Sequence, residues 1–484
     1  MGISSDRASL SIDINREADV TTTTQLPAAR PTATVLVVST AAFLASLDLF
    51  IVNIAFPEIR QAFGSAGLGS MSWILNAYTL VFAAFMNPAG RLGDRYGHRR
   101  IFLAGVWVFT VGSAACGLSG SFLALVAARA VQALGAALLM PSSLALLLAA
   151  VPAERRTVAV STWSAVGATA AALGPPVGGL LVQLSWRWIF FVNAPVGLIA
   201  ALAGGLVLSK AAGSGTGVPD LFGALSLVVG VGALVWTLIE LPVVGRDAIT
   251  LVAAAVGAGC AMALAVWRSL RHPSPAVDLA AVKVLPMWSS CLALLVFSAA
   301  HGAMLLSGVM LLTTVWGMPP AMAGLCLSPG PIMVVLVSLL AGRLVGRVGV
   351  GKVAAAGAAL YAVGIVVWLC TIGPEPHYFT DYFPAQLFTG TGVGLVMPSM
   401  SAVTGLALPA HRWGAGSAVT NTARQMGMVL GTTALTMIYQ AGVDLAAVRR
   451  GWVFVAVAAA TAAIIAVVLA LRWQPATDED RVTR

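Results

Sequence analysis

Charged side chains are scarce in this sequence. Of its 484 residues, only 9% are Asp, Glu, Lys or Arg, whereas 59% are hydrophobic. A soluble domain normally carries about a quarter of its residues charged, and no water-soluble fold hides this much apolar surface. The composition therefore excludes an ordinary soluble protein and predicts an all-α polytopic membrane protein, because a helix satisfies its own backbone polar groups inside lipid.

Cysteine is also rare, and no two cysteines stand at the spacing of a metal site or a redox motif. We predict that all five are small buried apolar residues: Cys116, Cys260, Cys291, Cys326 and Cys370. Clusters of His, Asp or Glu at ligand or triad spacing are likewise missing from the apolar stretches, which argues against an enzyme. No cofactor signature is present.

The formal net charge of +9 does not indicate a nucleic-acid-binding protein, because most Lys and Arg residues stand in short loops between apolar stretches. Cytoplasmic loops of membrane proteins carry an excess of these residues. When both termini are placed in the cytoplasm, fourteen basic loop residues lie on that side and five on the other. The count predicts two cytoplasmic termini.

Fourteen stretches are long and apolar enough to cross a bilayer, which takes about 20 helical residues. They are 34–56, 71–90, 101–119, 122–149, 157–182, 188–209, 219–240, 248–267, 288–314, 321–342, 353–372, 383–407, 414–438 and 451–471. Residues 1–33 and 473–484 are polar and are predicted to be cytoplasmic tails, the first of them disordered.

The sequence repeats itself at a nearly constant offset of 252 to 257 residues, which is the mark of an internal duplication. The repeated pieces are Met140-Pro141-Ser142 and Met397-Pro398-Ser399, Leu173-Gly174 and Leu430-Gly431, and Gly90-Arg91-Leu92 and Gly342-Arg343-Leu344. We therefore expect a six-helix bundle over 34–209, a linker with two extra helices over 210–286, and a second six-helix bundle over 287–472. Parallel repeats of this kind are typical of transporters with a site between the halves.

One carboxylate, Asp48, stands near the middle of the first span. A charge at that depth costs about 3 kcal/mol, so it indicates a functional group. We interpret Asp48 as the proton-binding residue; the alternative is a structural carboxylate that a neighbouring hydroxyl or Arg satisfies. Arg129 in the fourth span lies at a matching depth, at ~1.5 Å per residue. We expect the two to interact directly, through water or through Gln132, unless Arg129 only clamps backbone carbonyls.

The loop after the second span carries Gly90, Asp94, Arg95, Gly97 and Arg99. Glycines permit a tight turn, and Asp94 is able to accept hydrogen bonds from Arg95 or from a helix N-terminus. The loop is either a stable basic turn or a charge latch that breaks when two halves of the protein rock.

This loop closely resembles the signature of the major facilitator superfamily, and three further stretches resemble its fourteen-span drug/proton antiporters. They are Leu47–Pro57, Arg129–Gly135 and Leu173–Gly179, with Phe50, His98 and Ala133 departing from the usual residues; Trp186–Pro195 also fits. The resemblance implies the major facilitator fold, a proton-coupling role for Asp48, Arg129 and Gln132, and an antiporter motif at Gly174, Pro175, Gly178 and Gly179.

Several other polar residues are candidates for lining a substrate cavity: Asn53, Asn76, Tyr78, Glu240, His301, Arg424 and Gln425. Each has a structural alternative. Arg424 is equally a deep structural cation, and His301 is a titrating group or a hydrogen-bonded packing residue. Glu240 is an interfacial acid facing water or a group that attracts cations at the exit.

The resemblance implies a proton-coupled exporter of amphipathic small molecules, with the proton as coupling ion. The abundance of Arg, Ala, Gly and Val indicates a bacterial source, so we expect a bacterial plasma membrane and a monomer. A proton-coupled importer of a nutrient or siderophore-like solute is the alternative. The spans hold one deep acid, Asp48, and two deep bases, Arg129 and Arg424. Since each cation needs a partner, we predict that neutral, zwitterionic or weakly anionic compounds are handled at least as well as dications.

Overall fold

The computed structural model describes residues 31–64, 67–152, 155–209, 217–241, 247–279, 283–408 and 412–473, and every regular element in these ranges is a helix. Within these ranges, thirteen helical segments are long and apolar enough to span a membrane. The helix α17 (Trp413–Ile438) makes the fourteenth, because its 26 residues also suffice. The chain is an all-α polytopic membrane protein.

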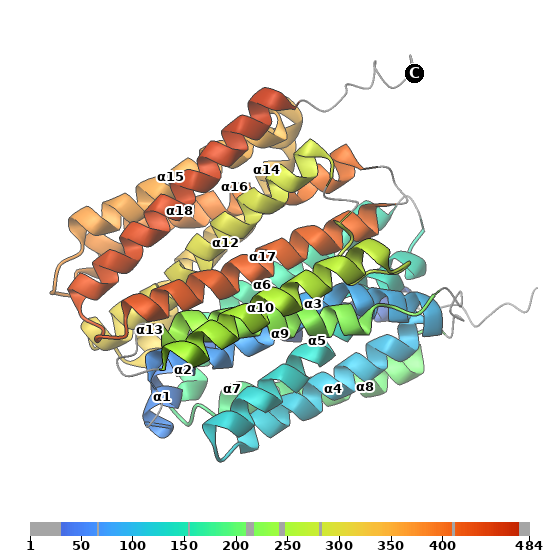
Figure 1. Ribbon diagram of the computed structural model, residues 1–484, viewed down its shortest axis with the longest axis horizontal. Coiled ribbons are helices and arrows are strands. Elements are labelled where there is room, and N and C mark those ends of the chain that lie inside the picture. The colour runs from blue at the N-terminus through green and yellow to red at the C-terminus, as the bar shows by residue number, and fades with distance from the viewer. Residues whose placement is uncertain are drawn as a thin grey trace, which may run out of the picture.

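The first half forms one bundle (Figure 1). Its helices are α1 (Pro31–Ala62), α2 (Leu68–Met71), α3 (Trp73–Tyr96), α4 (His98–Leu118), α5 (Phe122–Ala150), α6 (Arg156–Val182), α7 (Trp188–Phe191) and α8 (Asn193–Val207). The helix α1 begins at Pro31, a residue that suits a first helical turn, and so starts three residues before the end of the predicted tail. The rest of that tail and residues 474–484 lie outside the described ranges.

The linker contributes two helices and the second half contributes a second bundle. These elements are α9 (Leu221–Glu240), α10 (Ala248–Arg271), α12 (Leu285–Met310), η2 (Leu311–Val315), α13 (Pro320–Leu327), α14 (Pro329–Val348), α15 (Val350–Thr371), η3 (Tyr378–Tyr382), α16 (Phe383–Ala407), α17 and α18 (Leu445–Arg472). Acceptor side chains cap several of them. Asp247, for example, accepts from the backbone N–H of Ile249, which lowers the pKa of Asp247.

The two halves have the same backbone features at positions that correspond in the sequence repeat. Gly97 and Gly349, 252 residues apart, each join two long helices with a φ of +92°, a conformation that glycine adopts without strain. The second span of each half is also interrupted by one residue, Ser72 between α2 and α3 and Ser328 between α13 and α14. These matches agree with an internal duplication.

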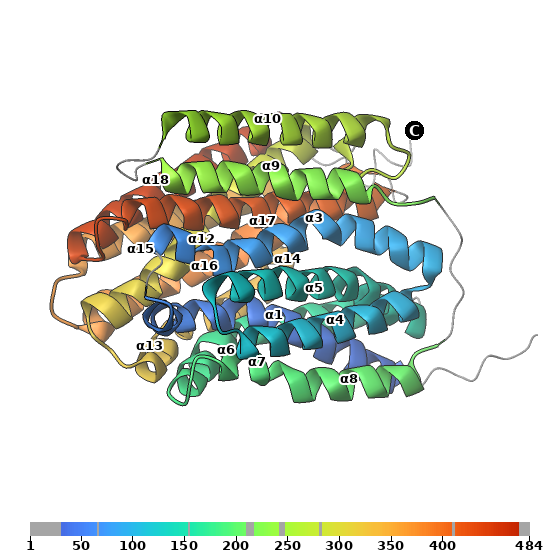
Figure 2. The same cartoon turned by 60° about the horizontal axis from the view of Figure 1, so that its bottom comes forward.

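The linker helices lie outside the two bundles (Figure 2). The helix α9 packs against α3 and α17, and α10 packs on α9. Most of α10 is exposed on the surface of the protein, which places it against lipid. Cys260 in α10 and Cys370 in α15 are exposed, so the prediction that all five cysteines are buried is wrong for these two. An apolar thiol is tolerated there because lipid, like a core, accepts apolar groups.

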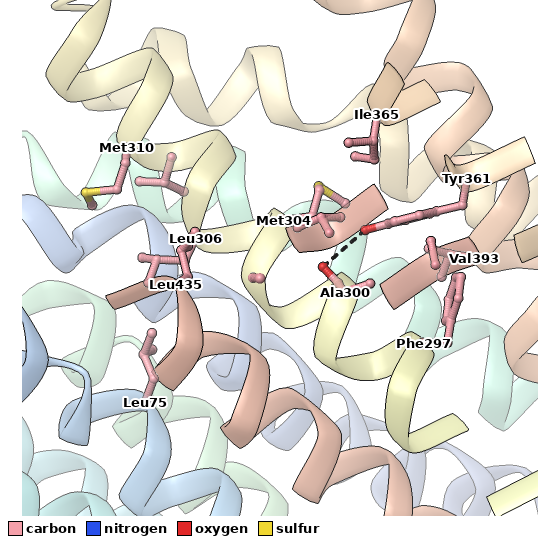
Figure 3. Packing of buried hydrophobic residues seen from close by; sticks show 14 of the residues in the cluster. Leu75, Phe297, Ala300, Met304, Leu306, Met310, Tyr361, Ile365, Val393 and Leu435 are labelled. Atoms are coloured by element: carbon pink, nitrogen blue, oxygen red, sulfur yellow. Dashed lines mark hydrogen bonds between the residues drawn. The ribbon is translucent and has the colours of Figure 1, made fainter. Parts of the chain in front are cut away.

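We call the end of the molecule where α1 begins and α18 ends the tail end, and the opposite end the far end. At the far end the bundles touch through α3 and α17: Asn76 donates to Thr433 Oγ1 at 3.1 Å and accepts from Thr432 Oγ1 at 2.6 Å. Beside them, Leu75 and Leu435 lie close to Leu306 and Met310 of α12 (Figure 3).

A second contact between the bundles joins α6 to α13 at the far end. The backbones of the two helices approach so closely that a Cβ at Gly179 would collide with the carbonyl of Pro320, and a Cβ at Gly324 with the carbonyl of Pro175. Small residues permit this approach between membrane helices. The structure therefore shows a state in which the far ends of the bundles are closed on each other.

Substitution of Gly179 by Leu is expected to separate the far ends, because the new side chain occupies space that Pro320 and Ala321 fill. Spin labels at Leu184 and Met322, which are 75% and 53% exposed, report that separation by double electron–electron resonance. The labels require a background without Cys260 and Cys370. We expect the mean label distance to increase by several ångströms relative to the parent, by analogy with other overpacked contacts.

The matched control is Gly257→Leu in α10, where no atom lies near the added side chain. It should leave the distance distribution unchanged. A Gly179→Leu distribution that overlaps the parent distribution would show that this contact does not hold the closed state.

Candidate functional site

Asp48 is fully buried near the middle of α1 and is held by three side chains. Arg129 Nη1 lies 2.5 Å from its Oδ2, Gln132 Nε2 donates to its Oδ1 at 2.8 Å, and Asn193 Nδ2 donates to Oδ1 at 3.2 Å. Charge-assisted bonds of this length are strong. The direct contact expected between Asp48 and Arg129 is present, and Gln132 joins it.

Arg129 is bound to more than the carboxylate. Its Nε donates to the carbonyl of Ile74 at 3.2 Å, and its guanidinium lies 4.2 Å from the ring centroid of Tyr78. It therefore acts both as a clamp on a backbone carbonyl and as the partner of Asp48. The cluster ties together α1, α3, α5 and α8.

Asn193 was not predicted to be part of this cluster. Its amide also donates to Ser113 Oγ at 3.0 Å, which adds α4 to the group of helices. The sequence does offer a signal for Asn193, because this residue stands in the stretch Trp186–Pro195, which fits the family resemblance. The break between α7 and α8 places it at the first turn of α8, facing α1.

A small cavity of about 20 Å³ lies between the bundles next to Arg129. A space of this size holds a single water molecule. Both halves contribute to its lining: Leu49, Asn53, Leu75, Asn76, Thr79 and Arg129 from the first, and Gly302, Leu305, Met428 and Thr432 from the second. Arg129 thus contacts Asp48 and the space between the bundles at once.

The structure places the other predicted cavity residues in different surroundings. Asn53 and Asn76 line the cavity, whereas Tyr78 is not among the residues that line it. Its ring lies 1% exposed inside the first bundle, and its hydroxyl is 3.4 Å from the carbonyl of Ala45. The face of α3 that carries Tyr78 packs on the ion pair instead.

Glu240 is only 7% exposed, so the interpretation of an interfacial acid facing water is wrong. It is buried because the end of α9 packs against α3. A hollow of about 330 Å³ lies beside it, lined by Ser70, Trp73, Phe122, Leu123, Val126, Trp236 and Glu240.

His301, Arg424 and Gln425 lie in the second bundle, apart from Asp48. Arg424 Nη2 donates to Asn421 Oδ1 at 2.7 Å, and Arg424 is close enough to His301 for an electrostatic interaction. Gln425 is fully buried. In the described part of the chain, His301 Nδ1 and both polar atoms of the Gln425 amide have no hydrogen-bond partner.

The predicted loop is helical in the structure except for Gly97, because α3 continues to Tyr96 and α4 begins at His98. In this motif, Asp94 lies 3.2 Å from His98 Nε2. Arg99 Nη2 donates to the carbonyl of Gly205 in α8 at 2.6 Å, and Arg95 stacks on Tyr96 at 5.4 Å. Gly90 approaches Pro141 of α5, and Gly97 forms the turn. These contacts stay within the first bundle, so the latch across the two halves remains a prediction.

The glycines of the predicted antiporter motif make close contacts on two sides of α6. A Cβ at Gly174 would lie 2.8 Å from Phe50 Cβ, and one at Gly178 would lie 2.5 Å from Ile54 Cγ2, both on α1. Gly179 and Pro175 face α13. The helix runs without interruption through Pro175 and Pro176. It is therefore wedged between the helix of Asp48 and the other bundle.

Removal of the cation from the Asp48 cluster should strongly destabilise the protein. We expect Arg129→Gln to cost about 3–5 kcal/mol, because it leaves a buried, unpaired carboxylate. The double variant Asp48→Asn, Arg129→Gln should regain much of that loss, since no charge then remains. Unfolding of detergent-solubilised protein, followed through a double-mutant cycle, measures the coupling. Additive effects of the two substitutions would contradict a buried ion pair.

The sequence profile described as Major Facilitator Superfamily matches residues 38–293 and 290–484. The Multidrug resistance protein Stp of Mycobacterium tuberculosis is 34% identical over 411 residues, covering 82% of this chain and 74% of that protein. The Tetracenomycin C resistance and export protein of Streptomyces glaucescens is 34% identical, covering 84% and 76%.

Another relative, the Methylenomycin A resistance protein of Bacillus subtilis, is 30% identical and covers 89% of this chain and 96% of its own. Among solved structures, a POT family transporter in complex with a thioalcohol-conjugated peptide aligns with a TM-score of 0.67 at 12% identity, over 90% of this chain and 95% of that one. That likeness concerns the fold alone. The sequence matches and the two-bundle architecture agree, and the chain belongs to the Major Facilitator Superfamily.

Proposed function

We propose that this protein is a proton-coupled antiporter that exports amphipathic small molecules, drugs or antibiotics, by alternating access. The observation that carries the proposal is the Asp48–Arg129 pair, which is buried and yet borders the cavity between the bundles through Arg129. Proton binding at Asp48 is therefore able to change the wall of the cavity in which a substrate would bind.

The geometry suggests how protons and substrates compete. While Asp48 is ionised, it holds Arg129 in the wall of the cavity. Protonation of Asp48 removes the only charge that holds the guanidinium in the described cluster and leaves Arg129 with neutral partners, such as the Ile74 carbonyl and Gln132. Held less strongly, Arg129 is able to move toward Leu49, Leu75 and Leu305. A cation among these apolar side chains disfavours an apolar substrate, so proton binding and substrate binding exclude each other.

Substrate binding also requires the bundles to move, because the cavity now has room for about one water molecule. The far ends are closed through α3–α17 and α6–α13. The tail end, which the charge count assigns to the cytoplasm, is the side from which the substrate would enter. Opening and closing of the two ends in alternation completes the cycle.

The proton gradient is sufficient for this task. One proton releases ~2.3 kcal/mol per 100 mV of membrane potential and ~1.4 kcal/mol per pH unit. Together these sustain roughly a 500-fold gradient of a neutral compound.

The names of the relatives favour export over import, since they refer to drug resistance or to export. Their bacterial sources support a bacterial plasma membrane as the location. The remaining alternative, a proton-coupled importer on the same fold, differs in the direction in which protons move with the substrate.

Asp48→Asn should abolish uphill transport and preserve substrate binding, because the amide keeps the size of the side chain but exchanges no proton. Inverted membrane vesicles energised with an acidic interior should accumulate fluorescent drugs when they carry the parent protein and fail to do so with the variant. A matched control is Glu375→Gln, whose side chain is 81% exposed and should transport normally. Equal accumulation by Asp48→Asn would remove Asp48 as the coupling group.

The direction of proton flow separates the two functions. Addition of a transported drug to energised inverted vesicles should make the interior less acidic if the protein is an antiporter, because protons leave as the drug enters. With de-energised vesicles, an importer would instead acidify the interior, since proton and solute then travel together. A pH-sensitive dye trapped inside the vesicles records either result.

A further inference from the structure

Arg424 is a partly buried cation of the second bundle, for which the described residues provide no acidic partner. Within the described ranges, Arg424 donates one hydrogen bond, to the neutral amide of Asn421, and no ion pair joins it. Arg129 in the first bundle is, by contrast, neutralised by Asp48. A cation within a membrane helix that lacks a counter-charge is costly, so the position calls for a negative partner from outside the chain.

Two other polar groups near Arg424 also lack partners. Gln425 is 0% exposed, and neither its amide nitrogen nor its oxygen has a hydrogen-bond partner in the part of the chain that the structure describes. The same is true of Nδ1 of His301. A buried polar atom that forms no hydrogen bond loses its solvation without compensation. Three such atoms on two neighbouring side chains therefore indicate a place that a polar ligand would satisfy.

These groups share one side of the second bundle. Asn421, Arg424, Gln425 and Met428 follow the i, i+3, i+4, i+7 spacing of a single helix face. Met428 lines the cavity between the bundles. The face is also turned toward the first bundle, because Asn421 contacts the sulfur of Met86 on α3.

His301 approaches the same place from α12. It adjoins Gly302, which lines the cavity and packs closely against Met428 of α17. The imidazole of His301 also packs against Tyr361, with the ring centroids 6.4 Å apart. The hydroxyl of Tyr361 donates to the carbonyl of Ala300 at 3.5 Å (Figure 3). The cluster therefore lies about one helical turn from the cavity, toward the tail end.

We propose that Arg424, His301 and Gln425 form a subsite for an anionic oxygen group of the exported molecule, such as a carboxylate or a phenolate. This inference rests on the proposed function and names its substrate class. Arg presents a planar fork of donors to a carboxylate, and the amide and imidazole supply further donors. The apolar body of the molecule then extends toward Leu305 and Met428 in the cavity, which gives an amphipathic ligand a polar and an apolar end.

The charge arrangement suits a monoanion better than a dication. A dication entering from the tail end would meet Arg424 before it reached Asp48, and Asp48 is already neutralised by Arg129. Export of a monoanion against one proton moves two elementary charges in the same direction. The membrane potential then acts on both charges, whereas it acts on one when a neutral compound is exported.

Binding of two probes that differ mainly in charge tests the subsite. Radiolabelled 2-naphthoate and its neutral amide, 2-naphthamide, are compared on purified full-length protein in detergent. We expect the parent protein to bind naphthoate about tenfold more tightly than naphthamide, the range of a charge-assisted bond. Arg424→Gln should lose this preference and still bind naphthamide, and Arg424→Lys should retain part of it.

The control is Arg472→Gln, an exposed arginine at the end of α18, which should keep the full preference. A parent protein without a preference for naphthoate, or an Arg424→Gln variant that retains it, would overturn the proposal. If Arg424→Gln binds neither probe, Gln425→Leu decides: a several-fold weaker preference supports the subsite, and an unchanged preference overturns it.

This binding test does not depend on transport. A protein that prefers naphthoate through Arg424 but moves no proton in inverted vesicles would retain the subsite and refute the proposed antiport. A protein that exchanges protons for drugs but shows no charge preference would retain the antiport and refute the subsite.

Discussion

The pairing of Asp48 with Arg129 is the interaction on which the rest of the first bundle depends. Its hydrogen bonds and ring contact reach α1, α3, α5 and α8 at one point. A buried ion pair of this kind adds little net stability but is costly to break on one side. The bundle is thus organised around a group whose charge can be changed by one proton, and this group borders the interface with the second bundle.

The second constraint is close helix packing at the far end. Small residues on α6 and α13 bring the bundles into backbone contact, while hydrogen bonds join α3 to α17. The helix α6 also contacts α1 through Gly174 and Gly178. A change at Asp48 on α1 therefore has a short physical route, through packed backbone, to the contact that holds the far ends together.

Much of this was predictable from sequence, and the misses have a common cause. Apolar length and the duplication predict the fourteen helices, and helix rise alone predicts that Asp48 and Arg129 lie at one depth. Sequence does not fix the rotation of a helix about its axis, which is set by its neighbours. For that reason Tyr78 and Glu240 were expected at a cavity and at water but lie buried, and Asn193 was not assigned to the ion-pair cluster.

Proton release on substrate binding tests the central claim most directly. A transported drug is added to purified protein in a weakly buffered detergent solution with a pH-sensitive dye, over a series of starting pH values. The account predicts that the parent protein releases protons, that Asp48→Asn releases none, and that Glu375→Gln behaves as the parent. Equal release by Asp48→Asn, with binding intact in all three, would contradict it.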